Sequence, residues 1–156
     1  MEYSKILKRL APCGLSCEKC FANANGNIQY HSSLLKKYLG EFDQYAERFV
    51  DLVGEPSFKN YSEFKELLSY FTEVDCPGCR ETNCQLFKAC NVKNCYKEKQ
   101  VDFCFQCTEF PCEKTGFDEH LKKRWVKMQQ RIKKIGIERF YEETKDDPRY
   151  VKVKVN

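Results

Sequence analysis

The sequence lacks the features that would place this 156-residue chain in a membrane or in an oxidising compartment. It has no run of 18 apolar residues, so a membrane-spanning helix is excluded. Residues 1–14 contain neither an apolar stretch of about 7–15 residues nor a small-residue cleavage site, and no secretory signal is therefore expected. We predict a cytoplasmic protein that does not bind membranes.

Motifs of the common enzyme classes are also missing. The chain contains no Gly-x-Ser-x-Gly sequence, phosphate-binding loop or dinucleotide fingerprint. Its only histidines, His31 and His120, lie among polar residues and are expected at the surface. The sequence therefore does not favour an enzyme. One catalytic alternative is a reactive thiol at Cys13, where the following Gly14 would let a substrate approach the backbone closely.

Cysteine is the residue that the chain has in excess, with 11 copies. Thiols stay reduced in the cytosol, where a dense cysteine framework usually binds metal or performs redox chemistry. The odd number also fits poorly with complete intramolecular pairing. With only two histidines present, any metal site must be made mainly of thiolates.

The cysteines fall into two segments, 13–20 and 76–112, separated by 55 residues without cysteine. Three pairs have the Cys-x-x-Cys spacing, which brings two sulfurs onto one ion at about 2.3 Å in a tetrahedral zinc site. In one of them Pro77 and Gly78 suit the tight turn that this geometry needs. The pairs are Cys17/Cys20, Cys76/Cys79 and Cys104/Cys107.

This supply of thiols predicts two four-thiolate zinc sites, with three cysteines left over. We expect the Cys76/Cys79 turn to serve one site and the Cys17/Cys20 turn another. Which later cysteines complete each site is left open by the sequence. An iron–sulfur cluster is the alternative cofactor, since it also takes four cysteines. The Cys13-x3-Cys17-x2-Cys20 spacing matches radical S-adenosylmethionine enzymes, but the alternating strands of their barrel are not predicted here.

Helical periodicity dominates the rest of the chain. Apolar residues recur three and four positions apart between about 28 and 72, and again between about 117 and 145. Glycines at 40, 54 and 136 are expected helix ends, and Asn60 with Glu63 an N-terminal capping box. The aromatic stripes are expected to pack as core, and residues 150–155 to form a short terminal strand. We predict one mainly α domain, 1–156, with helices around a loop-rich cysteine and metal core and little sheet.

The cysteine segments resemble a small prokaryotic family catalogued as domain of unknown function 3795. The similar stretches are CGLSCEKCFA at 13–22, CPGC at 76–79, CNVKNC at 90–95 and VDFCFQCTEFPCEK at 101–114, together with the later helix at 132–143. The resemblance implies a metal-binding, zinc-binding protein without an assigned activity. Cys84 lies outside the shared pattern and is interpreted as a spare thiol or substitute ligand. The implied ligands are Cys13, Cys17, Cys20, Cys76, Cys79, Cys90, Cys95, Cys104, Cys107 and Cys112.

The segment 121–134 carries seven basic residues and could hold the phosphates of a nucleic acid. The net charge is only +4, however, and lysine and arginine are good helix formers, so a solvated helix face is favoured. The predicted function is structural binding of two Zn2+ ions in an interaction module of unknown cellular role; its partner is left open by the sequence, with a protein as one candidate. An iron–sulfur carrier or redox enzyme and a zinc-dependent nucleic-acid-binding module are the two alternatives.

Overall fold

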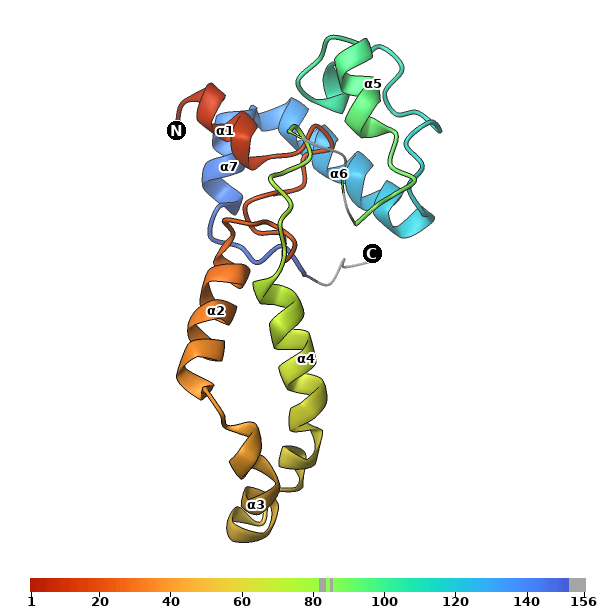
Figure 1. Ribbon diagram of the computed structural model, residues 1–156. Helices are drawn as coiled ribbons and strands as arrows, with labels where there is room; N and C mark the ends of the chain where they lie inside the picture. Colours follow the sequence, from red (N-terminus) through yellow and green to blue (C-terminus); the bar gives the residue numbers. More distant parts are fainter. Residues whose placement is uncertain (82–83, 85, 152–156) are drawn as a thin grey trace. The chain divides into compact units, whose positions relative to one another are not determined.

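The computed structural model describes residues 1–81, 84 and 86–151 and divides the chain into two compact units. The first unit combines residues 1–20 with 76–156, and the second comprises residues 21–75. Seven α-helices lie within the described residues, where the only β-pairing is an isolated bridge between Leu10 and Ser16 (Figure 1). The predicted mainly α fold with little sheet is confirmed.

The first unit contains helices α1, α5, α6 and α7 and the short 3-10 helix η2. Helix α6 is the longest, and its start is fixed by the Asp118 carboxylate, which accepts a hydrogen bond from the Leu121 N–H at 2.9 Å. It ends at Gly136, as the sequence predicts, and α7 follows at once. The bounds are Tyr3–Arg9 for α1, Val92–Glu98 for α5, Cys104–Gln106 for η2, Glu119–Ile135 for α6 and Ile137–Thr144 for α7.

One face of α6 joins the two apolar clusters of this unit. Leu121 and Trp125 lie in a cluster with the buried cysteines, whereas Ile132 lies in a second cluster with α1 and α7. Gln129, between them on the same face, is fully buried. Its side chain accepts a hydrogen bond from the Phe105 N–H at 2.8 Å and donates one to the Pro12 carbonyl at 3.3 Å. Because both ends of the amide are paired, Gln129 fixes the segments that carry Cys13 and Cys104 against α6.

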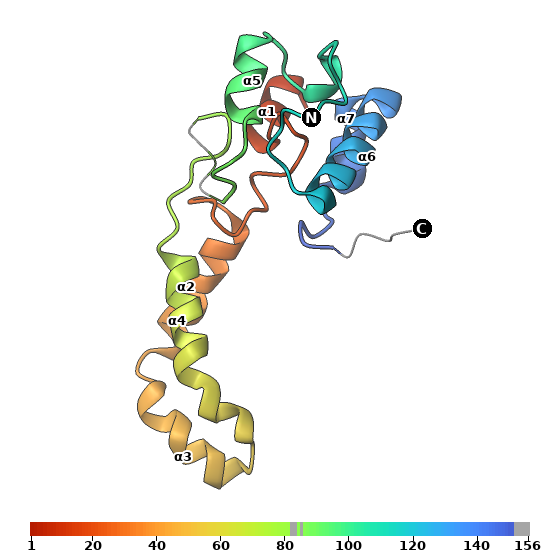
Figure 2. The ribbon, with the colours of Figure 1, turned by 90° about the vertical axis from the view of Figure 1, so that its right-hand side faces the viewer.

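The second unit is a set of short helices in which α2 and α4 run side by side (Figure 2). The helices end at Gly40 and Gly54, as the sequence predicts. The expected capping box at Asn60 is wrong, because its side chain makes no capping hydrogen bond and the 3-10 helix η1 leads directly into α4. The bounds are Asn27–Leu39 for α2, Asp43–Val53 for α3, Pro56–Asn60 for η1 and Tyr61–Thr72 for α4.

The aromatic stripes of the second unit form core only in part. Phe42 stacks on Phe49 with ring centroids 5.6 Å apart and meets the ring of Tyr61 at 5.0 Å. Other apolar side chains stay open to solvent, with Tyr38 79% and Leu52 70% exposed. The expectation that the stripes are core throughout is wrong here, because three short helices bury only one face of each helix.

The sequence does not predict two of the helices, α1 and α5, since each is only seven residues long and follows no clear apolar stripe. The expected terminal strand at 150–155 falls mostly on residues 152–155, which lie outside the described residues. Among the helices that the structure describes, none combines the length and apolar character needed to cross a membrane.

Candidate metal centre

Most of the predicted ligand cysteines come together in the first unit. Cys13, Cys17 and Cys90 are buried in the same apolar cluster as Trp125, and Cys79, Cys104 and Cys112 pack against that cluster. None of the eleven cysteines, all of which lie among the described residues, is in a disulfide. The two cysteine segments of the sequence therefore share one core, although 55 residues separate them.

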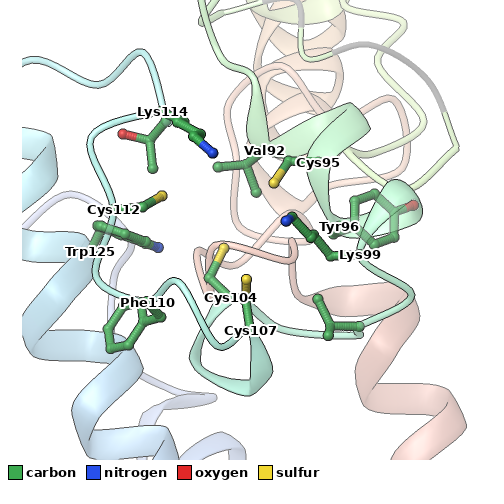
Figure 3. Close-up of a pocket in the computed structure, with 12 residues that line it drawn as sticks. Val92, Cys95, Tyr96, Lys99, Cys104, Cys107, Phe110, Cys112, Lys114 and Trp125 are labelled. Carbon is green, nitrogen blue, oxygen red and sulfur yellow. The ribbon is translucent and has the colours of Figure 1, made fainter.

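Four cysteines line a single small pocket. Cys95 lies in α5, Cys104 and Cys107 flank η2, and Cys112 follows in the next loop. In Figure 3 their sulfur atoms surround a common space, whose volume is about 30 Å³. A cavity of this size has room for an ion or one to two waters but not for an organic substrate, which needs roughly 300 Å³ or more.

Backbone hydrogen bonds hold the four segments in place around this pocket. The Cys104 N–H donates to the Pro12 carbonyl and the Cys107 N–H to the Cys104 carbonyl, each at 3.1 Å. The Asn91 N–H donates to the Thr115 carbonyl at 3.0 Å, which brings the loop after Cys112 against the start of α5. Gly116 allows this approach, because it has a φ of +71° and a Cβ there would lie 2.0 Å from the Ala89 carbonyl oxygen.

Two thiols of the pocket, those of Cys104 and Cys95, are difficult to ionise on their own. Burial, together with repulsion from Cys95 and Cys112, raises the pKa of the Cys104 thiol to about 12, although the nearby Trp125 indole acts in the opposite direction. Burial also raises the pKa of Cys95, with further contributions from Cys107 and Cys112. These thiols therefore stay protonated at neutral pH unless a cation enters the pocket and compensates their negative charge.

The surroundings of the pocket suit a negatively charged centre. The indole Nε1 of Trp125 is buried and points toward the sulfur atoms (Figure 3), where a weak contact opposes the rise that burial causes in the pKa of the Cys104 thiol but falls short of normal hydrogen-bond geometry. Lys99 and Lys114 also line the pocket, and both form ion pairs with Glu109. The Glu109 N–H donates to the Cys107 sulfur at 3.4 Å. A buried donor that only weakly contacts Cys104, and two cations that share one carboxylate, fit a group whose sulfurs are thiolates.

Three further cysteines form a second cluster. The Cys79 thiol donates a hydrogen bond that lowers the pKa of Cys17, and a second contact to Cys79 lowers the pKa of Cys84. Cys79, as the shared donor, has its pKa raised. The sequence predicts that the Cys17 and Cys79 turns serve different sites, whereas the structure places these two thiols in contact with each other. Cys84, interpreted as a spare thiol, lies in the same cluster.

The remaining predicted ligands do not line the four-cysteine pocket. Cys90 is buried, and Cys84 contributes to the rise of its pKa after burial itself. Cys20 accepts a hydrogen bond from the Tyr150 hydroxyl at 3.8 Å, and Cys76 is buried. Burial raises the pKa of Cys13 above its usual range, which makes its free thiol a poor nucleophile at neutral pH. The catalytic alternative at Cys13 is therefore not supported.

None of these cysteine clusters is a closed coordination shell. Within residues 1–81, 84 and 86–151, no group of three or more His, Cys, Asp or Glu side chains stands in an arrangement that could hold a metal ion. The four-cysteine pocket is a shared cavity lined by thiols rather than a formed tetrahedron. His31 and His120 are both exposed, as expected.

Two contributors to these sites are not predicted by the sequence. Cys84 could have been included from its position five residues after Cys79, within the densest part of the cysteine segment. The apolar spacing predicts Trp125 only as a core residue, and no sequence signal indicates that its indole N–H faces the thiols.

Residues 9–117 match the model of a family described as "Protein of unknown function (DUF3795)". The matched range includes every predicted ligand cysteine and ends before the similar stretch at 132–143. Comparison with curated proteins and with solved structures gave no match.

Proposed function

Because the chain belongs to the DUF3795 family, whose description gives no activity, we propose a function from the site itself: Cys95, Cys104, Cys107 and Cys112 bind a structural zinc ion. The observation that carries this proposal is the single 30 Å³ pocket lined by all four thiols. Four sulfur ligands at about 2.3 Å complete the tetrahedral shell of a closed structural zinc site.

Charge balance supports the same centre. A zinc ion with four thiolates carries a net charge of about −2. Lys99 and Lys114 at the rim of the pocket reduce the cost of that charge, and the Trp125 N–H gains a sulfur acceptor. The small volume favours one ion over an iron–sulfur cluster, which must also enclose its inorganic sulfides.

A second zinc ion is proposed at Cys17, Cys79 and Cys84, with a fourth donor from the remaining thiols. Its support is the hydrogen-bonded chain of three thiols. An ion there would join residue 17 to residues 79–84 and close the chain around the 55-residue insertion. Zinc would then organise the first unit, and the exposed apolar side chains of the second, such as Tyr38 and Leu52, support a role in binding a protein partner.

The test is the metal content of protein purified anaerobically with a reductant, measured by elemental analysis together with an absorption spectrum. We expect a colourless protein with two zinc ions per chain. Brown protein containing iron, with visible absorption that bleaches on reduction, would show the iron–sulfur alternative instead. Protein that is metal-free and remains fully folded would refute a structural metal.

A further inference from the structure

A second and much larger cavity lies in the first unit, away from the four-cysteine pocket. It has a volume of about 440 Å³ and is bounded by the loop of residues 14–16, one side of α6 and the segment that follows α7. This volume falls within the range of about 300–1,000 Å³ that is typical of small-molecule sites. None of its lining residues is predicted to bind a metal.

Basic side chains dominate the lining of this cavity. Five cations line it against a single carboxylate, that of Asp147. The Lys19 ammonium is occupied, because it donates to the carbonyls of Thr144, Lys145 and Asp147. The basic lining residues are Lys19, Arg124, Lys127, Arg131 and Arg149.

Three of these cations have no compensating negative side chain. Arg131 pairs with Glu143 at 2.7 Å, but Arg124, Lys127 and Arg149 form no ion pair within the described residues. Arg124 donates instead to the Arg149 carbonyl at 2.7 Å, and Arg149 donates to the Ser16 carbonyl. These contacts hold two guanidinium groups close to each other in a half-buried position.

Burial and the positive charge of Arg149 both affect the pKa of the Arg124 guanidinium. Burial lowers its pKa, and the positive charge of Arg149 lowers it further. Two adjacent guanidinium groups repel each other, and an anion placed between them would remove that cost. The cationic wall of the cavity is therefore incomplete without a negatively charged partner.

The remaining surface of the cavity is apolar. Leu10, Leu15 and Phe140 are buried, and Met128 is half-buried. Such a floor binds a ring or a short aliphatic chain through apolar contact, whereas the basic side binds an anionic group. The cavity thus offers two kinds of surface to one ligand.

We propose that this cavity binds a small organic phosphate, with the phosphate held by Arg124, Lys127 and Arg149 and an apolar portion resting on Leu15 and Met128. Three cations without ion pairs favour a doubly charged phosphate over a singly charged carboxylate. Arginine forms bidentate hydrogen bonds with phosphate oxygens, which suits the two guanidinium groups. The cavity shares no lining residue with the proposed zinc ligands, although the charge of Arg149 reaches the second cysteine cluster, where it adds to the effect of Cys79 and lowers the pKa of Cys17 and Cys84.

A nucleic acid would contact a different set of α6 residues from those that line the cavity. A long backbone of phosphates would contact the exposed basic residues along the helix, including Lys133 and Lys134. On the same helix, Lys122 and Lys123 are already paired with Glu113 and Glu119. The concave, partly apolar site favours a small ligand instead.

Isothermal titration of the purified full-length chain with 1-naphthyl phosphate tests the proposal, with 1-naphthol and inorganic phosphate as the two partial ligands. We expect 1:1 binding of the whole compound, at least about tenfold tighter than either part. Arg124→Gln combined with Lys127→Gln should weaken binding by at least about tenfold, because each lost charged hydrogen bond is substantial. Lys133→Gln with Lys134→Gln is the matched control, on the same helix but outside the cavity, and should leave affinity unchanged.

Lys127→Gln alone is the second variant if the double variant does not fold, since Lys127 is exposed and makes no contact that the fold requires. It should still weaken the binding of naphthyl phosphate severalfold. Equal affinity for naphthol and naphthyl phosphate, or no binding of either, would overturn the proposal. So would an equal loss in the control pair, or tight binding of a single-stranded oligonucleotide that both pairs of substitutions weaken, since these indicate a nucleic-acid surface.

Discussion

Removing zinc from the reduced protein with a chelator is expected to unfold the first unit. Structural zinc contributes an apparent free energy of about 10–16 kcal/mol in small finger peptides, which is comparable to the whole stability of a domain, about 5–15 kcal/mol. The central part of the first unit has little regular structure to hold it together without metal, because its described residues between 76 and 118 form one short α-helix, α5, and the 3-10 helix η2. The single tryptophan, Trp125, lies in this unit, so its fluorescence reports the transition.

The contribution of each proposed zinc site to zinc content and to the free energy of unfolding should be measurable with single cysteine variants. Cys107→Ser is expected to lower the zinc content from two ions per chain to one and to reduce the free energy of unfolding by several kcal/mol. Cys79→Ser is the matched control, because Cys79 is also half-buried but lies in the other cluster. It should also lose one zinc ion, while the ion in the pocket that Trp125 lines is kept.

Urea unfolding of both variants, with zinc content measured on the same samples, checks this prediction. Unchanged zinc content in Cys107→Ser would remove Cys107 from the site. A chelated wild-type protein that keeps its full cooperative unfolding transition would contradict the structural role of the metal altogether.

Replacing Trp125 by phenylalanine is expected to weaken zinc binding by roughly 10–100-fold, the usual effect of losing a group that supports a metal ligand. In the metal-bound protein the indole N–H donates to a thiolate, which phenylalanine cannot replace. With the thiols protonated, the same N–H makes only a weak contact with Cys104, so its removal costs little beyond the lost packing. The substitution should therefore destabilise the zinc-bound protein more than the zinc-free protein.

Phe117→Leu is the control for packing, because the Phe117 ring contacts Trp125 at 6.0 Å but does not line the pocket. It should destabilise both forms to a similar extent and leave zinc affinity within about twofold, since it alters no ligand or supporting donor. Competition with a chromophoric chelator measures both affinities. Equal zinc affinity in Trp125→Phe and wild type would show that the indole N–H does not support the centre.

Much of the fold could be predicted from local patterns. Glycines at 40, 54 and 136 end helices as expected, because each adopts a positive φ that other residues disfavour. The apolar spacing of Leu121, Trp125 and Ile132 identifies the buried face of α6. The short helices α1 and α5 could not be predicted, since tertiary packing rather than their own periodicity stabilises seven residues as a helix.

The sequence indicates which cysteines are candidate ligands, but it does not predict which of them lie together in the fold. The Cys-x-x-Cys spacing correctly places Cys104 and Cys107 at one pocket, because three residues of chain limit their separation. It fails for Cys17 and Cys79, whose contact depends on how the chain returns after residues 21–75. Such long-range pairings follow from the packing of the whole unit and leave no trace in local spacing.

Zinc K-edge X-ray absorption on the anaerobically purified protein measures the central claim most directly. Cysteine-only coordination at both centres predicts a first shell of four sulfur atoms at about 2.3 Å from zinc, with no nitrogen or oxygen neighbours. In the Cys79→Ser variant, the remaining ion at Cys95, Cys104, Cys107 and Cys112 should show the same four sulfurs. A shell of oxygen and nitrogen atoms in that variant would mean that the four-cysteine pocket is not a metal centre.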